Sequence, residues 1–182
     1  YENIISKIDT IEAKQTVRAG WSRERSRNLI FRLTERYGNI DIVWAASDSM
    51  ALGVLDALQS GLSILDKEKV VIGGIDWTKE GIKNIQNKSL SASVGGHIMQ
   101  IAWSLVKAFD HHHGIKVFEK SANTTTYDLE LINQANIAKY LPLAKDVNWN
   151  KVDFRQYSMF LNKELTQYQF NMTSVIEQIS NQ

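Results

Sequence analysis

Apolar runs alternate with amphipathic stretches along most of this chain, and the alternation predicts its fold. Strand-like segments are expected at 11–17, 42–46, 69–74 and 90–94. The unbroken apolar run 42–46 is typical of a strand covered on both faces. Apolar spacing of the helical kind predicts helices over 22–37, 50–61, 79–86 and 98–109. Alternating strands and helices favour a parallel sheet with helices on both faces, so we predict an α/β fold.

Polar residues mark where the predicted helices begin and end. Ser22 and Thr78 stand immediately before two of them and are good N-cap residues. The triplet 47–49 offers three such residues in a row, directly after an apolar strand. Gly38 stands where a helix stop is expected. The junction at 47–49 therefore places small polar groups and a helix N-terminus at the carboxyl end of a strand, where ligands bind in open α/β sheets.

Three regions follow from this pattern. We expect an α/β core over 1–96, a crossover helix and returning strand over 97–131, and a mostly helical or irregular C-terminal tail over 132–182. The returning strand is expected at 124–131 and a short helix at 133–140. Residues 1–8 resemble the last turns of a helix, so we expect the chain to begin inside an element, as a fragment or a shortened mature chain would; a natural start with a short helix is the alternative.

Composition narrows the possible functions. The 182 residues carry a formal net charge of +1 with acids and bases interspersed, so no nucleic-acid footprint is expected. The absence of cysteine excludes disulfides, thiolate zinc sites and cysteine nucleophiles. No apolar run approaches the roughly 18–20 residues of a membrane-spanning helix.

The ends of the predicted strands carry the candidate site. If the sheet is parallel, these ends meet at one edge, and the residues that we expect to bind ligand there are Ser47, Asp48, Asp76, Trp77, Gly96 and His97, with Trp21 from the preceding loop. Carboxylates accept hydrogen bonds from hydroxyl pairs, aromatic faces pack on the apolar side of a sugar ring, and a glycine pair lets backbone approach a ligand. The set suits a polyhydroxylated ligand.

Structural roles compete with these functional ones. Asp48 and Asp76 could simply cap helices, although a cap and a ligand contact are compatible. Trp44 and Trp103 are expected in the core, whereas Trp21 and Trp77 stand in loops where either role is open.

Other chemistry finds little support. Neighbouring residues on a helix point in different directions, so the run 111–113 of three histidines is expected to be a solvated helix end and not a metal site. Neither glycine pair has the spacing of a phosphate-binding loop, and no cofactor is expected. Nothing assembles a nucleophile with a base, so we do not expect an enzyme.

Three segments resemble type I periplasmic sugar-binding proteins of the ribose-binding kind. They are 44–53 (Trp-Ala-Ala-Ser-Asp-Ser-Met-Ala-Leu-Gly), 71–77 (Val-Ile-Gly-Gly-Ile-Asp-Trp) and 90–97 (Leu-Ser-Ala-Ser-Val-Gly-Gly-His), and their order and spacing agree over roughly 11–115. The resemblance implies the periplasmic-binding-protein type I fold, mainly its C-terminal lobe. It also implies two lobes that close on a ligand like a hinge, with the N-terminal lobe absent from this chain.

The resemblance also implies individual contacts. Ser47 stands where relatives often carry a sugar-contacting Asn, Asp76 matches their Gly-x-Asp carboxylate, and Trp21 matches an aromatic after the first strand. Where relatives often supply a Gln, this chain has Gly96 followed by His97, which argues against ribose itself. Asp48 is then expected chiefly to cap and brace its turn.

Two functions are therefore expected. The first is a periplasmic solute-binding protein that captures a sugar or sugar-like ligand for a membrane transporter or a sensor. The second is the effector domain of a Lac repressor-type transcription regulator, which shares the fold, although the tail beyond residue 140 fits a regulator poorly.

Overall fold

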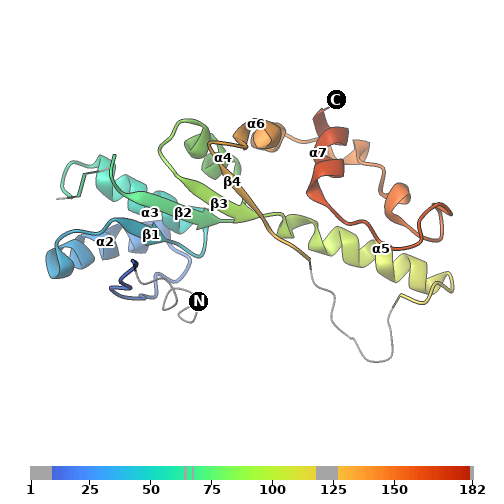
Figure 1. The fold of residues 1–182 in the computed structure, drawn as a ribbon, viewed down its shortest axis with the longest axis horizontal. Coiled ribbons are helices and arrows are strands. Elements are labelled where there is room, and N and C mark those ends of the chain that lie inside the picture. Colours follow the sequence, from blue (N-terminus) through green and yellow to red (C-terminus); the bar gives the residue numbers. More distant parts are fainter. Residues whose placement is uncertain (1–9, 64, 67, 118–126, 181–182) are drawn as a thin grey trace.

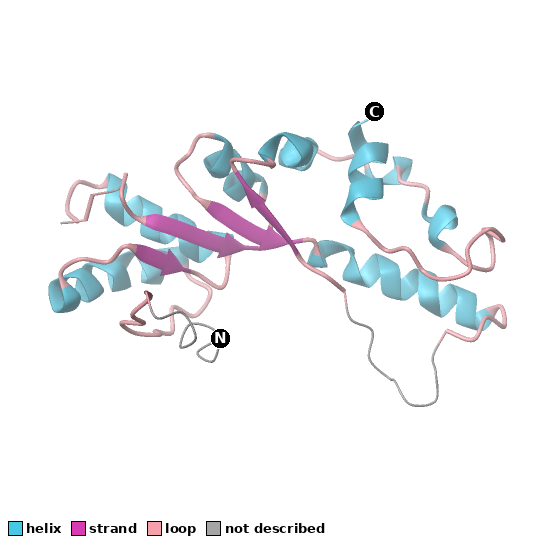
Figure 2. Cartoon of the chain, viewed as in Figure 1, coloured by secondary structure: helices cyan, strands magenta, loops and turns pink. Residues whose placement is uncertain are grey.

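A four-stranded sheet forms the centre of the molecule. The computed structural model describes residues 10–63, 65–66, 68–117 and 127–180. The strands lie in the order β1 (Ile42–Trp44), β2 (Val71–Ile75), β3 (Ala92–Gly95) and β4 (Glu130–Asn133). The first three are parallel and β4 is antiparallel to β3 (Figure 2). The α/β fold with a mainly parallel sheet is confirmed.

Helix α2 (Arg23–Tyr37) precedes β1, and a helix follows each parallel strand, as the alternation requires. These are α3 (Asp48–Gln59), α4 (Lys79–Gln86) and, after the single turn η1 (His97–Met99), α5 (Gln100–His112). Ser22, Ser47 and Thr78 each accept a hydrogen bond at the start of a helix, from the amides of residues 25, 50 and 81. The predicted caps at Ser22 and Thr78 are confirmed, and of the triplet 47–49 it is Ser47 that caps.

One part of the core lies between the sheet and α3, and the buried cluster continues over α4 and α5 into the tail. Helix α3 is buried along almost its whole length, because the sheet covers one side and α2 the other. A Cβ at Gly53 would collide with the carbonyl oxygen of Arg23, so α2 and α3 meet with their backbones in contact. Glycine at 53 is what permits this close approach.

The opposite face of β1 and β2 is open in the described part of the chain. Ile42, Trp44 and Val71 point there and are 54%, 38% and 48% exposed. The prediction that Trp44 lies in the core is therefore wrong. Its ring lies over Gly73, where a Cβ would collide with it, on the side away from α3.

The tail folds back along α5 (Figure 1). It contains α6 (Ile137–Tyr140), η2 (Leu141–Ala144), η3 (Trp149–Lys151), η4 (Phe154–Tyr157) and α7 (Met172–Ser180). Trp103 of α5 stacks on Phe170 at a centroid distance of 4.9 Å and meets Tyr157 edge-on at 4.8 Å. The expected burial of Trp103 is confirmed, and it is the tail that buries it.

Several predicted elements differ from the structure. Residues 11–17 form no strand and are almost entirely exposed, because no described strand lies beside them to complete a ladder. The returning strand, expected at 124–131, is β4 at 130–133; residues 124–126 lie outside the described ranges. The helix expected at 133–140 is only α6, because the side chains of Asn133 and Asn136 bond to backbone in a turn that precedes it.

Other boundaries shift by a few residues, as they do for β3, which begins at Ala92 and not at 90. The expected helix end at 1–8 lies outside the described residues, and the division into three regions stays a prediction.

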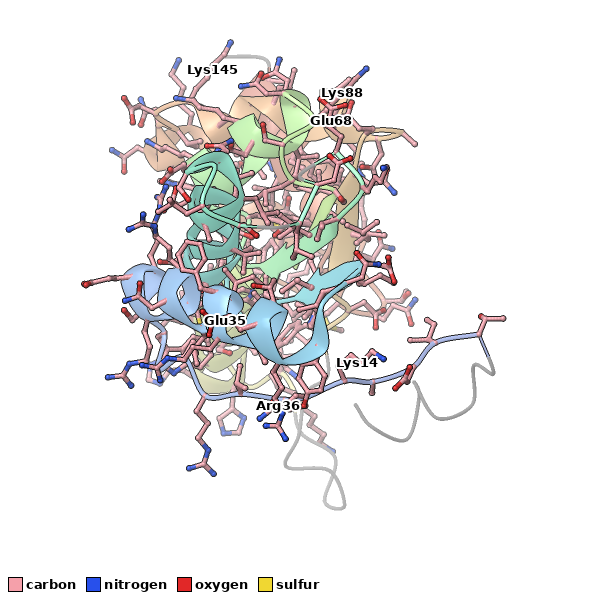
Figure 3. All side chains as sticks on the ribbon, turned by 90° about the vertical axis from the view of Figure 1, so that its left-hand side faces the viewer. Lys14, Glu35, Arg36, Glu68, Lys88 and Lys145 are labelled. Atoms are coloured by element: carbon pink, nitrogen blue, oxygen red, sulfur yellow. The ribbon has the colours of Figure 1, made fainter. Side chains whose placement is uncertain are left out.

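The surface carries charges of both signs. In Figure 3, Lys88 and Glu68 lie near the top of the view, and Glu35 and Arg36 lie in its lower half. Among the described residues, no helix combines the length and the apolarity that crossing a membrane requires.

Candidate functional site

The carboxyl ends of β1, β2 and β3 meet at one edge of the sheet, here called the binding edge (residues 45–48, 76–78 and 95–97). In Figure 2 the three arrows end on the side from which α5 leaves the sheet. Contacts across the edge join all three ends: the Asp48 carboxylate, after β1, accepts hydrogen bonds from Thr78, after β2, and from Ser93 of β3. The predicted meeting of the strand ends is what the structure shows.

Asp76 and His97 present the polar groups of this edge to solvent. The Oδ1 atom of Asp76 lies 3.3 Å from Nε2 of His97, and their side chains are 37% and 34% exposed. The Asp76 amide donates to the carbonyl of Val94 at 2.9 Å, which fixes the backbone of Asp76 to the end of β3. A carboxylate and an imidazole therefore stand side by side at an accessible strand end, where they can accept and donate hydrogen bonds.

The backbone at this edge is strained. Among the described residues, positive φ angles at positions other than glycine occur at Trp21 (59°), Asp76 (121°), Trp77 (61°) and Lys88 (63°). Such conformations cost free energy and tend to cluster where function requires them. Three of these four residues are among the expected ligand contacts.

Asp48 lies beneath the edge and is fully buried. Its Oδ2 accepts from the amide and hydroxyl of Thr78 at 2.7 and 2.9 Å, and its Oδ1 accepts from the hydroxyl of Ser93 at 2.6 Å. Burial raises the pKa of Asp48, while the hydrogen bonds from Ser93 and Thr78 oppose that shift. Each of its oxygens is thus engaged inside the protein.

Trp77 and Ser47 are also buried, each 4% exposed. The indole N–H of Trp77 donates to the carbonyl of Ser93 at 3.1 Å, and its ring packs on Tyr140 at a centroid distance of 4.9 Å. Ser47 caps α3. The seven expected contacts therefore divide: Trp21, Asp76, Gly96 and His97 reach the surface, whereas Ser47, Asp48 and Trp77 face inward.

Trp21 stands in the turn that leads into α2 and is 71% exposed. The next turn is well fixed, because the guanidinium of Arg23 bonds to Asp56 of α3 at 2.6 and 2.8 Å and to Glu80 of α4 at 2.8 Å. The indole is therefore carried by an anchored helix start while its own face remains free.

The tail reaches the binding edge, which the sequence did not indicate. A Cβ at Gly96 would stand 3.4 Å from the Cγ atom of Met172, at the start of α7. Beside it, Lys139 bonds to Thr173 at 2.7 Å and to Glu130 at 3.4 Å, and Tyr140 bonds to Glu130. These contacts join α6, α7 and β4 next to the end of β3.

Ser93, Gly74 and Gly81 were also missed, and Gly95 was considered only as part of a glycine pair that could approach a ligand, whereas in the structure it makes room for the ring of Trp77. Their roles depend on side chains brought close by the fold, so a single sequence offers no signal for them beyond the presence of glycine next to strand ends.

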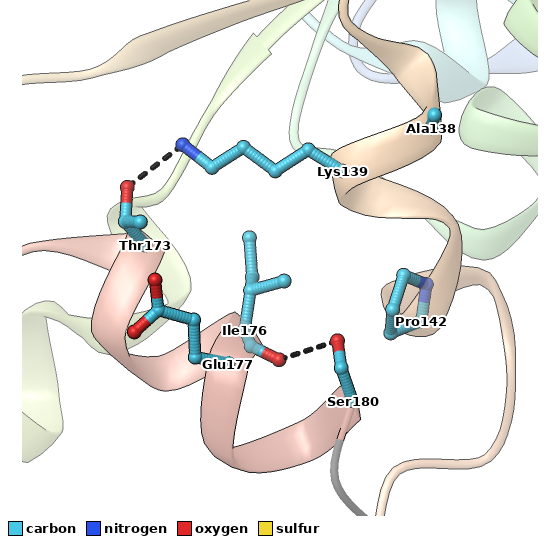
Figure 4. A pocket seen from close by; sticks show the side chains of 7 residues that line it. All are labelled: Ala138, Lys139, Pro142, Thr173, Ile176, Glu177 and Ser180. Carbon is cyan, nitrogen blue, oxygen red and sulfur yellow. Dashed lines mark hydrogen bonds between the residues drawn. The ribbon is translucent and has the colours of Figure 1, made fainter.

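A hollow of about 370 Å³ lies between α6, η2 and α7 (Figure 4). Its lining residues are Ala138, Lys139, Pro142, Thr173, Ile176, Glu177 and Ser180. Lys139 donates to Thr173 and Ser180 donates to the carbonyl of Ile176, so some of its polar groups are already paired. The hollow belongs to the tail and not to the binding edge.

The three histidines at 111–113 end α5. The His113 ring packs against Phe109 and Phe160, with centroid distances of 4.2 and 4.4 Å. Within the described ranges, no three His, Asp or Glu residues are grouped so that they could hold a metal ion.

The pattern of the periplasmic binding protein domain family matches residues 3–115, more than half of the chain. The chain belongs to this family. The resemblance expected from the three strand-end segments is thereby confirmed, and the binding edge lies within the matched region.

Curated relatives of this periplasmic binding protein domain are ribose import binding proteins. That of Bacillus subtilis is 30% identical over 118 residues, which are 64% of this chain and 36% of the relative. That of Haemophilus influenzae is 29% identical over 76 residues, 42% of this chain and 24% of the relative. The chain thus spans about a quarter to a third of these relatives. Their names describe binding proteins and not enzymes, which supports the same expectation here at the level of the family.

Solved structures share the fold. A periplasmic sugar-binding protein from Pseudomonas fluorescens matches with a TM-score of 0.77 and 22% identity, covering 96% of this chain and 53% of that one. A solute-binding protein from Bacillus halodurans with bound myo-inositol matches with a TM-score of 0.64 and 24% identity, covering 77% and 46%. The first match extends over the tail region as well as the sheet.

Proposed function

We propose that this domain is one lobe of a solute-binding protein that captures a sugar or sugar-like ligand. The observation that carries the proposal is the pair formed by Asp76 and His97, each about one third exposed and 3.3 Å apart where the parallel strands end. Relatives that bind ribose, myo-inositol and D-allose, according to their names, support the ligand class.

The chemistry of the pair suits hydroxyl groups. The Asp76 carboxylate accepts from two neighbouring hydroxyls, a charge-assisted interaction, and the His97 ring accepts or donates according to its tautomer. Trp21, exposed on the turn before α2, offers an aromatic face to the apolar side of a sugar ring. Gly96, with φ of 104°, leaves the backbone between the strand end and His97 uncovered by a side chain.

A second lobe completes the cleft in this proposal. The chain spans about half of the solved structures that it matches. Helix α5 and the turn before it expose the apolar side chains of Ile98, Ile101, Leu105 and Phe109, which are 44%, 74%, 65% and 40% exposed. Apolar surface of this kind marks an interface. We assign it to the N-terminal lobe, which would hold the ligand against the binding edge.

The cellular role follows from the relatives and not from the site. Import binding proteins deliver a solute to a membrane transporter, so we propose a periplasmic location and a transporter or a sensor as partner.

Substitution of the exposed contacts tests the ligand site. In the intact protein, Asp76→Ala and Trp21→Ala should each weaken binding about 10- to 100-fold, because each removes a charged hydrogen-bond acceptor or a stacking face at the cleft. Isothermal titration calorimetry with D-ribose, D-allose, myo-inositol and L-arabinose gives the affinities.

Matched controls are available in the same chain. Asp41→Ala removes an exposed carboxylate from the opposite end of β1, and Trp149→Ala removes a 41% exposed indole from the tail. Both should bind like the wild type. Unchanged affinity in the Asp76 and Trp21 variants would refute the site, and no binding of any of the four sugars by the wild type would refute the ligand class.

A further inference from the structure

Asp48 contacts the turn that carries Asp76, Trp77 is part of that turn, and both side chains are buried. They are 0% and 4% exposed, although both stand at the binding edge. Their sequence positions made them candidates for ligand contact, but because both side chains are buried we consider a structural role for them.

Asp48 holds the turn from below. Its carboxylate binds the amide and hydroxyl of Thr78, two residues after Asp76, and the hydroxyl of Ser93 on the neighbouring strand. Asp48 does not cap its own helix, since Ser47 does so. It serves the start of α4 instead, where the Thr78 hydroxyl in turn accepts from the amide of Gly81 at 3.0 Å.

Two glycines make room for this carboxylate. A Cβ at Gly74 would stand 2.6 Å from Oδ1 of Asp48, and a Cβ at Gly81 would collide with Oδ2. Any larger residue at either position would displace the carboxylate from Thr78 or Ser93. The absence of side chains at Gly74 and Gly81 therefore leaves the space that the Asp48 carboxylate fills.

Trp77 holds the turn from the other side. Its indole N–H donates to the carbonyl of Ser93 at 3.1 Å, and a Cβ at Gly95 would collide with its ring. Asp48 and Trp77 both form a hydrogen bond with Ser93: its hydroxyl donates to Asp48, and its carbonyl accepts from Trp77. Asp76 directly precedes Trp77 and Thr78, the two residues held by these contacts, and has a φ of 121°, a conformation that surrounding structure must impose.

We propose that Asp48 and Trp77 are positioning residues that hold the strained backbone of Asp76 so that its carboxylate faces the ligand. The proposal rests on the proposed function, in which Asp76 contacts a sugar. It assigns Asp48 and Trp77 no contact with the ligand.

Three substitutions in the intact protein test this role. Trp77→Phe keeps an aromatic ring but removes the N–H. Asp48→Ala removes all three hydrogen bonds. Asp48→Asn is the rescue variant, because its amide oxygen can accept from Thr78 while its NH2 donates to the Ser93 hydroxyl. Trp103→Phe is the matched control: Trp103 is equally buried, at 3%, but lies in the tail cluster.

Two readouts separate positioning from general stability. Amide hydrogen exchange of residues 76–78 reports the turn without any ligand, and calorimetry with the same four sugars reports binding. Loss of one hydrogen bond should speed exchange about fivefold in Trp77→Phe, and more in Asp48→Ala. Affinity should fall about 10-fold in both, while Trp103→Phe and Asp48→Asn stay within about threefold of the wild type.

The outcomes distinguish the two proposals. If the wild type binds none of the sugars but exchange at 76–78 changes as expected, the ligand class fails and the anchoring of the turn stands. If exchange and affinity in Trp77→Phe, and in Asp48→Ala where it folds, match those in Trp103→Phe, the anchoring is overturned. Faster exchange with unchanged affinity would also overturn the positioning role.

Discussion

Single residues at the binding edge combine strain with exposure. Asp76 has a φ of 121° and a carboxylate that is about one third exposed, so an unfavourable backbone supports an accessible acceptor. A residue retained in such a conformation often pays in stability for a function that needs its side chain. Asp76 should therefore be a position where stability and binding respond in opposite directions.

The substitution Asp76→Gly exposes this trade-off. Glycine adopts positive φ without steric cost, so the free energy of unfolding should rise by about 1 kcal/mol while sugar affinity is lost. Lys88→Gly is the control, because Lys88 has a φ of 63° in the turn after α4, and it should raise stability with no change in affinity. Urea denaturation and calorimetry measure the two quantities. Lower stability in Asp76→Gly would show that its backbone is not strained.

Helices α2, α3 and α4 are joined by one guanidinium. Arg23 bonds to Asp56 at 2.6 and 2.8 Å and to Glu80 at 2.8 Å. The hydrogen bond from Arg23 lowers the pKa of Asp56 below its ordinary value of 3.8. A carboxyl group whose pKa is lower in the folded state stabilises the protein above its unfolded pKa, and that contribution is lost as the pH falls through the folded value.

The variant Arg23→Gln should accordingly be pH-sensitive. Near pH 7 it should unfold more easily than the wild type by about 1 kcal/mol or less, because the groups are partly exposed and water screens them. The difference should shrink as the pH falls below about 4, where Asp56 takes up its proton. Arg155→Gln, which breaks a pair with Asp153 inside one turn, should have a smaller effect. A difference that is constant from pH 7 to 3 would contradict the assignment.

At the scale of the whole molecule, a buried carboxylate attaches the tail to α5. Asp110 is fully buried and accepts from the Ser158 hydroxyl, from the Met159 amide at 2.7 Å and from the Tyr168 hydroxyl at 2.9 Å. Asp110 also lies next to Tyr168 in space, and burial together with this carboxylate raises the pKa of the tyrosine. The tail is thus fixed at a single polar point as well as by the rings around Trp103.

Removing the Asp110 carboxylate should weaken the attachment of the tail to α5. Asp110→Ala leaves the buried Ser158 hydroxyl and the partly buried Met159 amide and Tyr168 hydroxyl without their acceptor, which should lower the free energy of unfolding by about 2–3 kcal/mol. Limited proteolysis should then cut within 158–168 faster than in the wild type, while Asp128→Ala, at an exposed position, should behave as the wild type does. Equal protection of the tail in both variants would place its anchorage elsewhere.

Local signals in the sequence predicted much of this architecture. The caps at Ser22 and Thr78 and the helix after Ser47 depend on neighbouring residues, so the sequence displays them directly. The strand predicted at 11–17 does not form, for the opposite reason: an alternating pattern becomes a strand only beside a partner strand. The predicted burial of Trp44 was wrong because a position within a strand does not reveal whether a helix covers the face of the sheet to which its side chain points.

The location of the site could be predicted from the sequence, but the orientation of its individual side chains could not. Parallel strands bring their ends together, so the edge followed from topology. The inward turn of Trp77 and the engagement of Asp48 depend on Ser93 and on glycines that are distant in the sequence. Long-range packing of this kind leaves no local pattern to read.

The contact between Met172 and Gly96 has a practical consequence for sensor engineering. It brings the start of the last helix to the end of β3, so the C-terminal region lies next to the expected ligand. A dye attached to the exposed side of α7 would report on solute capture from outside the cleft.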